Sequence, residues 1–220
     1  MKINNLCVNF DEKVIFQDFS IEFEKNKITA VLGNSGIGKT TLLNAIAKLI
    51  PFRGEISGVE KVSYMFQEPR LIEPLTVYDN LLYVLDKKSP DNTEKIKEIL
   101  EKVELKDEIN TFCHELSGGM KSRVALARAF LIPSDTLLMD EPMRSLDLGL
   151  RLRQCEVLKS LLESFPRTTL FVTHSVSEAV SVADKIIVLG ETPAKVICEY
   201  VTADYEKGQL MQELTEILSK

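Results

Sequence analysis

The sequence is poor in the residues that build metal clusters and disulfide frameworks. Its four cysteines, at positions 7, 113, 155 and 198, form no C-x-x-C pair, and the chain has only two histidines. Cysteines that lie this far apart argue against both a metal cluster and a set of structural disulfides. We therefore expect the protein to work in a reducing cytoplasm.

Long apolar runs are also missing. The apolar segments have the length of strands, as at residues 136–139, whereas a membrane-spanning helix needs about 20 residues. Residues 1–10 carry Lys2 and then an alternating pattern instead of an apolar core with a cleavage site, so we expect no signal peptide. A protein of this kind serves a membrane, if at all, from outside the lipid.

The composition shows no excess of basic residues. With 27 Lys and Arg against 33 Asp and Glu, the net charge is −6, which disfavours a nucleic-acid backbone as the main partner. The 220 residues, 45% of them apolar, suffice for one large domain or one domain with an inserted subdomain.

Residues 33–41 match the phosphate-binding pattern G-x-x-x-x-G-K-[ST]. They follow an apolar run at residues 28–32 and precede a helix-patterned segment, which is the context that this pattern requires. Glycines allow the backbone N–H groups to turn inward, and the next helix points its positive N-terminal end at the same spot, so an anion is expected there. Lys39 would bind the β- and γ-phosphates, and the Thr40 hydroxyl would be a Mg²⁺ ligand. The predicted phosphate-binding residues are Gly33, Asn34, Ser35, Gly36, Ile37, Gly38, Lys39, Thr40 and Thr41.

Strand patterns dominate both ends of the chain. Residues 2–10 and 14–23 alternate apolar and polar, which predicts an antiparallel side sheet. Strands that alternate with helices after a phosphate loop imply a doubly wound α/β fold with a parallel central sheet, whose ligand lies at the carboxyl ends of the strands. The other predicted strands are residues 28–32, 54–57, 61–66, 136–139, 168–172, 185–189 and 195–201.

Helix patterns occupy residues 69–131. We predict that they form a helical subdomain inserted into an α/β core of residues 1–68 and 132–220. Further helices are expected at residues 176–183 and 209–218, and at 148–162. In the helix at residues 148–162, the side chains predicted to point into the core are Leu148, Leu152, Cys155 and Leu162.

An apolar strand ends in two acids, Asp140 and Glu141. In a chain with a phosphate loop, an acid at the end of a strand is where a second Mg²⁺ contact is needed, and we assign Asp140 to that role. Glu141 is one residue further and is predicted to hold or deprotonate the attacking water as a general base.

The segment that follows residue 115 resembles the signature motif of the ATP-binding cassette (ABC) transporter ATPases. Other motifs stand in the order that this family has, with a Q-loop glutamine at Gln67 and a switch histidine at His174. The resemblance implies hydrolysis of ATP with Mg²⁺. The signature residues are Leu116, Ser117, Gly118, Gly119 and Met120, and those of the D-loop are Ser145, Leu146 and Asp147.

The signature has a physical reason of its own. Ser117 is a natural N-cap for the helix behind it, whose free N–H groups would form a second anion site. The resemblance implies a homodimer in which each ATP lies between the phosphate loop of one copy and the signature of the other, a closed two-fold arrangement.

Three more residues receive roles by the resemblance. His174 would hydrogen-bond the γ-phosphate and Glu141, and Gln67 would contact Mg²⁺ or the attacking water. Phe10 stands at the adenine-stacking position, although a place in the core is an equal alternative. His114 is interpreted as structural.

Residues 66–80 are similar to the corresponding segment of importer subunits. This similarity implies an integral membrane permease as the direct partner, a substrate-binding protein as an indirect partner, and no nucleic acid. It also implies a peripheral location on the cytoplasmic face of the membrane. Met120 and Pro193 resemble the nitrate, sulfonate and taurine branch. Met143 and Arg144 depart from the usual Phe-Gly, as does Cys113 from the frequent Pro, which leaves the local loop geometry open. The alternative is an ABC ATPase of DNA repair or translation, but such chains have coiled coils or tandem cassettes that this sequence lacks.

Overall fold

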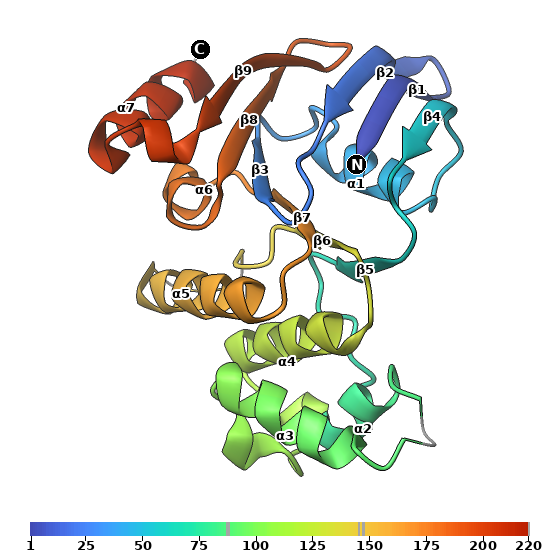
Figure 1. Ribbon diagram of the computed structural model, residues 1–220, viewed down its shortest axis with the longest axis vertical. Coiled ribbons are helices and arrows are strands. Elements are labelled where there is room, and N and C mark those ends of the chain that lie inside the picture. Colours follow the sequence, from blue (N-terminus) through green and yellow to red (C-terminus); the bar gives the residue numbers. More distant parts are fainter. Residues whose placement is uncertain (87–88, 145, 147, 220) are drawn as a thin grey trace.

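Two β-sheets organise the computed structural model, which describes residues 1–86, 89–144, 146 and 148–219 (Figure 1). In the smaller sheet, β1 (Lys2–Phe10) pairs antiparallel with β2 (Lys13–Glu22) on one side and with β4 (Arg53–Ser57) on the other. Its inner face is apolar, and Ile3, Leu6 and Val8 of β1 are buried. An irregularity in the pairing between Ile3 and Leu6 shifts the alternation by one residue, so that both side chains face inward. The predicted antiparallel side sheet is confirmed, with β4 as its third strand.

The larger sheet has six strands, of which the first five in spatial order run parallel and the last runs antiparallel to its neighbour. The two strands at positions two and three are buried along their whole length, as expected of parallel strands with both faces covered. The predicted α/β fold with a parallel central sheet is confirmed. The spatial order is β5 (Val62–Met65), β6 (Thr136–Asp140), β7 (Thr168–Val172), β3 (Ile28–Leu32), β8 (Lys185–Gly190) and β9 (Lys195–Val201).

The register of the central strands brings three loops together. Val172, the last residue of β7, lies opposite Asp140 of β6 and opposite Val31 of β3. All three strands run in the same direction, so their carboxyl ends meet at one edge of the sheet. The segments that begin at residues 33, 141 and 173 therefore start side by side.

Seven α-helices complete the described fold, and none of those in the described residues is long and apolar enough to cross a membrane. In Figure 1, α2, α3 and α4 lie together at the end of the molecule away from the side sheet, and α5 lies between them and the central sheet. The helices are α1 (Lys39–Ile46), α2 (Val77–Leu82), α3 (Asn92–Lys102), α4 (Gly118–Leu131), α5 (Leu148–Ser164), α6 (Val176–Val182) and α7 (Lys207–Leu218).

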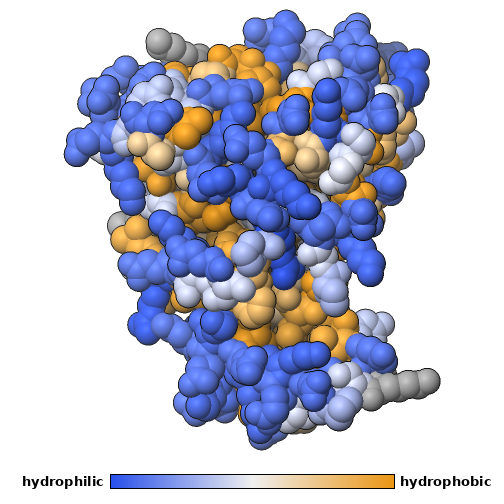
Figure 2. All heavy atoms as spheres, in the orientation of Figure 1, coloured by the Kyte–Doolittle hydropathy of each residue, from blue (hydrophilic) through white to orange (hydrophobic). Residues whose placement is uncertain are grey.

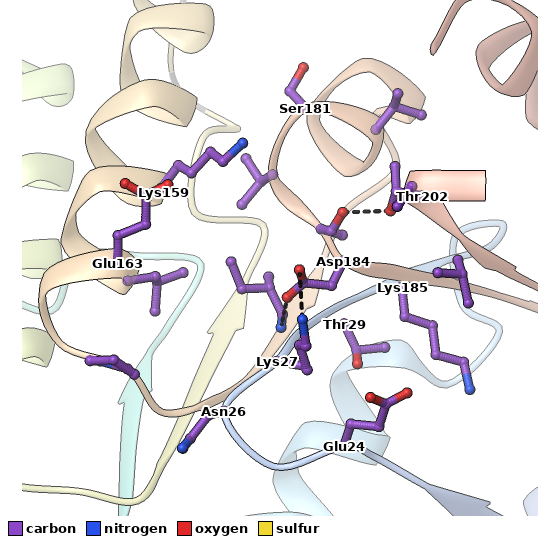
Figure 3. A pocket seen from close by; sticks show the side chains of 18 of the residues that line it. Glu24, Asn26, Lys27, Thr29, Lys159, Glu163, Ser181, Asp184, Lys185 and Thr202 are labelled. Carbon is purple, nitrogen blue, oxygen red and sulfur yellow. Dashed lines mark hydrogen bonds and ion pairs between the residues drawn. The ribbon is translucent and has the colours of Figure 1, made fainter. Parts of the chain in front are cut away.

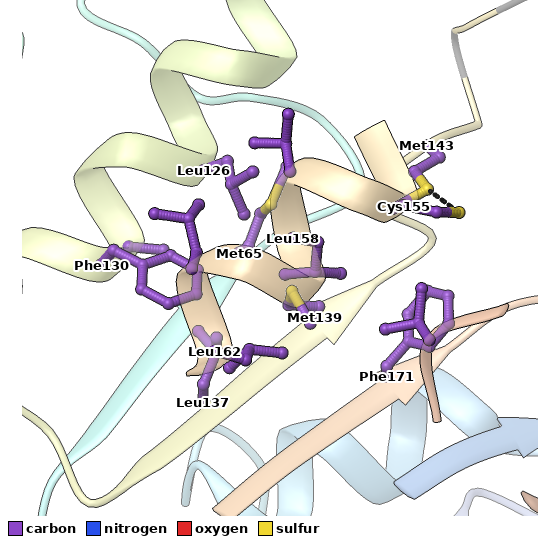
Figure 4. Close-up of a cluster of buried hydrophobic side chains, with 14 of the residues drawn as sticks. Met65, Leu126, Phe130, Leu137, Met139, Met143, Cys155, Leu158, Leu162 and Phe171 are labelled. Carbon is purple, nitrogen blue, oxygen red and sulfur yellow. Dashed lines mark hydrogen bonds between the residues drawn. The ribbon is translucent and has the colours of Figure 1, made fainter. Parts of the chain in front are cut away.

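The core between the helices and the central sheet is continuous. Leu126 and Phe130 of α4 and Leu158 of α5 belong to the same buried cluster as Met139 of β6 (Figure 4). This packing fixes α4, the signature helix, relative to β6, the strand that ends at Asp140, because protein interiors are close-packed and transmit displacement.

One prediction about α5 is wrong. Cys155 and Leu162 are buried as expected, but the side chain of Leu152 is 49% exposed, and the side chain of Leu148 lies outside the described residues. A helix turns by 3.6 residues, so the stripe that contains Cys155, Leu158 and Leu162 leaves position 152 at its border. Leu152 therefore does not belong to the core of this chain.

The surface is mainly hydrophilic. Figure 2 shows polar and charged side chains over most of one face, with apolar side chains exposed in the band at the level of α4. The exposed apolar residues of the chain include Tyr83, Phe112 and Leu150.

Candidate active site

The phosphate loop has the backbone that an anion site needs. Gly36 and Gly38 have φ values of 79° and 112°, and a Cβ at Gly38 would meet Ile15 Cγ2 at 2.7 Å. Glycine is required at Gly38 for both reasons. The loop leads into α1, whose first N–H groups point back at it, and Thr40 stands exposed at the start of this helix.

Lys39 is buried and closes the loop on itself. Its Nζ donates hydrogen bonds to the carbonyls of Gly33 at 2.7 Å and Asn34 at 3.1 Å. Burial lowers the pKa of Lys39, and the charges of Glu141 and Asp140 oppose that shift. The ammonium group thus already lies where the loop would surround a phosphate.

Asp140 and Glu141 end β6 at the same edge of the sheet. Asp140 is buried, and burial raises the pKa of its carboxyl, while a hydrogen bond with the Thr40 side chain opposes the shift. Glu141 has a φ of 45°, in the left-handed region, and its N–H donates to the Val172 carbonyl at 2.9 Å. This sharp turn after the strand directs Glu141 toward the end of β7.

The side chains of Glu141 and His174 meet across the two strand ends. His174 Nδ1 lies 3.4 Å from Glu141 Oε1, and the other carboxylate oxygen, Oε2, lies 3.5 Å from Arg144 Nη1. His174 is exposed, whereas the Glu141 side chain is 17% exposed. Phosphate-loop lysine, acids and switch histidine, identified separately in the sequence, are therefore neighbours in the fold.

Gln67 follows β5 and is exposed beside the same group. With its amide oxygen turned toward Arg144, it accepts hydrogen bonds from Arg144 Nε at 3.3 Å and from Nη1. The segment behind it is held by Arg128 of α4, which donates to the carbonyls of Pro69 at 2.7 Å and Arg70 at 2.9 Å. The segment after Gln67 is thus fastened to the signature helix.

The signature residues form a separate surface. The Ser117 hydroxyl accepts a hydrogen bond from Met120 N at 3.3 Å and caps α4, as predicted, and Ser117 and Gly118 are exposed while Leu116 is buried. A cavity of about 200 Å³ opens beside them, and its lining contains no residue of the phosphate loop. It is lined by Glu104, Ser117, Gly119, Met120, Arg123, Leu146, Leu150, Arg153 and Gln154.

The remaining predicted residues divide into three cases. Phe10 is 47% exposed at the end of β1, so its alternative place in the core is wrong. Leu146 is buried, whereas Ser145 and Asp147 of the D-loop lie outside the described residues. His114, interpreted as structural, is exposed, and its Nδ1 lies 3.2 Å from the Glu73 carbonyl.

A model of one family matches residues 16–144 of this chain, and its description is ABC transporter. The chain belongs to the ABC transporter family. Two aliphatic sulfonates import ATP-binding proteins are similar to it: SsuB 2 of Mesorhizobium japonicum, 38% identical with 86% of this chain and 77% of the relative covered, and SsuB of Bacillus cereus, 37% identical with 89% and 83% covered.

A third relative is the sulfate/thiosulfate import ATP-binding protein CysA of Escherichia coli, 36% identical over 87% of this chain; the match spans 58% of that protein's length. The solved structure of cbiO1 from Clostridium perfringens, described as part of the ABC transporter complex cbiONQ, matches the fold with a TM-score of 0.82. It covers 92% of this chain and 88% of its own at 20% identity. ATP binding and ATPase activity are the properties that membership of this family implies.

The donor set suits Mg²⁺ better than a soft metal. The Thr40 hydroxyl and the Asp140 carboxylate are hard oxygen ligands, which Mg²⁺ prefers. Among the described residues no three His, Cys, Asp or Glu side chains gather into a metal site. A few protein oxygens beside a phosphate-binding loop are the usual arrangement for this ion, which keeps waters and phosphate oxygens as its other ligands.

Sequence reasoning missed an ion pair behind the switch histidine, between the buried Glu178 and the half-buried Arg151. The Glu178 carboxylate accepts a hydrogen bond from Thr173 Oγ1 at 2.6 Å and lies 3.3 Å from Arg151 Nε, while Arg151 Nη2 donates to the Leu146 carbonyl at 3.1 Å. The pair therefore joins the start of the switch loop to the D-loop. The one feature of the sequence that could have indicated this ion pair is the acid Glu178 on the inner face of the short helix α6.

A cavity of about 560 Å³ lies elsewhere, at the amino ends of β3, β7 and β8 (Figure 3). Lys27, Lys185 and Asp184 are among its lining residues, and Lys27 Nζ lies 3.5 Å from Asp184 Oδ1. It contains no residue of the phosphate loop and no acid of β6. We therefore place the candidate active site at the opposite edge of the sheet, where the motifs meet.

Proposed function

We propose that this ABC-family chain is the ATP-hydrolysing subunit of an importer and that it couples ATP binding and hydrolysis to uptake through a separate membrane permease. The observation that carries the proposal is the contact of Glu141 with His174 at the sheet edge that also holds Lys39 and Asp140. Acid, histidine and phosphate-loop lysine at one edge form the set that phosphoryl transfer to water requires.

In the proposed reaction Lys39 moves its hydrogen bonds from the loop carbonyls to the β- and γ-phosphates. Glu141 accepts a proton from the attacking water, whose oxygen bonds to the γ-phosphorus as the bond to the bridging oxygen of ADP breaks. His174 orients Glu141 and donates to the transferred phosphate. Mg²⁺, held through Thr40 and Asp140, would neutralise charge on the phosphates. Phe10, which is exposed at the end of β1 in the side sheet, would stack on adenine.

The site of one chain is incomplete in this proposal. Ser117 and Gly118 are exposed at the start of α4, and no phosphate-loop residue lines the cavity beside them. A second copy that offers its signature N–H groups to the nucleotide would close the site, and the same contact repeated by symmetry would form a homodimer with two shared sites. Binding of ATP then favours the closed dimer, and hydrolysis reopens it.

The proposed partners follow from the relatives and from one linkage. Arg128 fastens the segment after Gln67 to the signature helix, so closure of the dimer would move the surface near Gln67 that the permease contacts. The substrate would be a small solute such as an aliphatic sulfonate, nitrate or taurine, delivered by a substrate-binding protein. The chain would act at the cytoplasmic face of the membrane.

The test is transport in vesicles that contain a candidate importer permease, with the purified chain added. ATP-dependent uptake of a sulfonate that requires this chain and is lost with Lys39→Ala supports the proposal. ATP hydrolysis that responds to DNA or ribosomes but not to the permease contradicts it.

A further inference from the structure

Arg144 contacts two groups of the proposed site at once. Its Nη1 lies 3.5 Å from Glu141 Oε2, and its guanidinium donates to the Gln67 amide oxygen. Both contacts are made by the guanidinium group, so they require the side chain of Arg144. The arrangement therefore depends on this chain's own residue.

The carboxylate oxygen that Arg144 faces has little else to bind. Glu141 Oε2 is buried and has no hydrogen-bond partner among the described residues, while Oε1 faces His174. Oε2 therefore faces the guanidinium group and has no other partner among the described residues. A general base must lie within hydrogen-bond reach of the proton that it accepts.

Gln67 is engaged in the same way. The family resemblance implies that its side chain contacts Mg²⁺ or the attacking water, whereas with the amide assigned as above its oxygen faces Arg144. The planar guanidinium offers several donors in a fixed fork, so it can bind both partners, which a point charge does less well. The Arg144 side chain is 58% exposed and is free to swing away when the site fills.

We propose that Arg144 is a positioning residue that holds Glu141 and Gln67 together and thereby restrains hydrolysis. The inference rests on the proposed function. Glu141 becomes available as a base only when Arg144 releases it, and the held form lowers the fraction of sites that react. Because Arg144 is mostly exposed, the restraint is modest, about two- to fivefold in rate.

The test compares ATP hydrolysis by the full chain, alone and with its permease, in the wild type, Arg144→Ala, Arg144→Lys and the surface control Arg53→Ala. We expect Arg144→Ala to raise kcat by about two- to fivefold with little change of KM. Arg144→Lys should lie between Arg144→Ala and the wild type, and Arg53→Ala should equal the wild type. In a Glu141→Gln background, Arg144→Ala should produce no rise.

An unchanged kcat in Arg144→Ala would overturn the inference, and so would a fall, because a fall would mean that Arg144 assists the reaction directly. If the Tm of Arg144→Ala is lower than that of the wild type, the rate comparison is made with Arg144→Gln instead. Wild-type hydrolysis that Lys39→Ala abolishes supports the proposed function whatever Arg144 does. Wild-type protein that neither binds nor hydrolyses ATP contradicts the proposed function itself, and the inference falls with it.

Discussion

Lys39 Nζ donates a hydrogen bond to the carbonyl of Gly33 at 2.7 Å, six residues earlier in the same loop. The contact keeps a buried cation satisfied, since an unpaired buried charge is costly. It also places the ammonium group at the centre of the loop before any phosphate is bound, so binding exchanges carbonyl oxygens for phosphate oxygens.

Lys39→Ala should therefore weaken nucleotide binding by about 10- to 100-fold, the usual cost of losing hydrogen bonds to a charged group. Titration of the full chain with a fluorescent ATP analogue measures the effect. Lys97→Ala, which removes an exposed lysine from α3, is the matched control and should bind as the wild type does. Tight binding by Lys39→Ala would contradict the assignment of the phosphate loop.

Ser117→Ala should act on stability and on catalysis separately. Loss of the N-cap of α4 costs about 1 kcal/mol, which lowers Tm by about 2–4 °C in a chain of this size. Thr76→Ala removes a similar cap, that of α2, whose hydroxyl accepts from Asp79 N at 3.1 Å. Both variants should melt earlier, but only Ser117→Ala should also lower the ATPase rate. Equal rates in the two variants would argue against a nucleotide contact by the signature.

Much of the fold and the site was predictable because the informative residues are local in sequence. A glycine-rich loop between an apolar strand and a helix, two acids at a strand end and a serine before a helix each have a local physical reason. Leu152 shows the limit, since the border of a helix's buried stripe depends on what packs against it. The ion pair of Arg144 with Glu141 spans only three residues, but it depends on the left-handed backbone at Glu141, which the sequence pattern did not indicate. The ion pair of Arg151 with Glu178 was not predictable because it is a tertiary contact between α5 and α6.

Glu178 should make stability depend on pH. Burial raises the pKa of its carboxyl, although Thr173 and Arg151 oppose the shift. Between the ordinary value of 4.5 and the raised pKa, the folded chain binds more protons at this group than the unfolded chain does. The contribution of Glu178 to the free energy of unfolding therefore falls as pH rises through this window.

Urea unfolding of the wild type and of Glu178→Gln at several pH values measures that contribution. The free energy of unfolding of the wild type minus that of Glu178→Gln should decrease as pH rises above 4.5 and become constant above the raised pKa. Glu163→Gln, at an exposed position of α5, should show no such decrease. A difference that grows with pH would mean that the ion pair with Arg151 outweighs the cost of burial.

The central claim is that Glu141 activates the water that attacks ATP. The direct measurement is single-turnover ATP hydrolysis by the full chain and by Glu141→Gln at saturating ATP and Mg²⁺, with nucleotide binding and dimer formation followed in the same samples. The account predicts that Glu141→Gln binds ATP, forms the dimer and hydrolyses ATP at least about 100-fold more slowly. Hydrolysis by Glu141→Gln at a near-normal rate would contradict it.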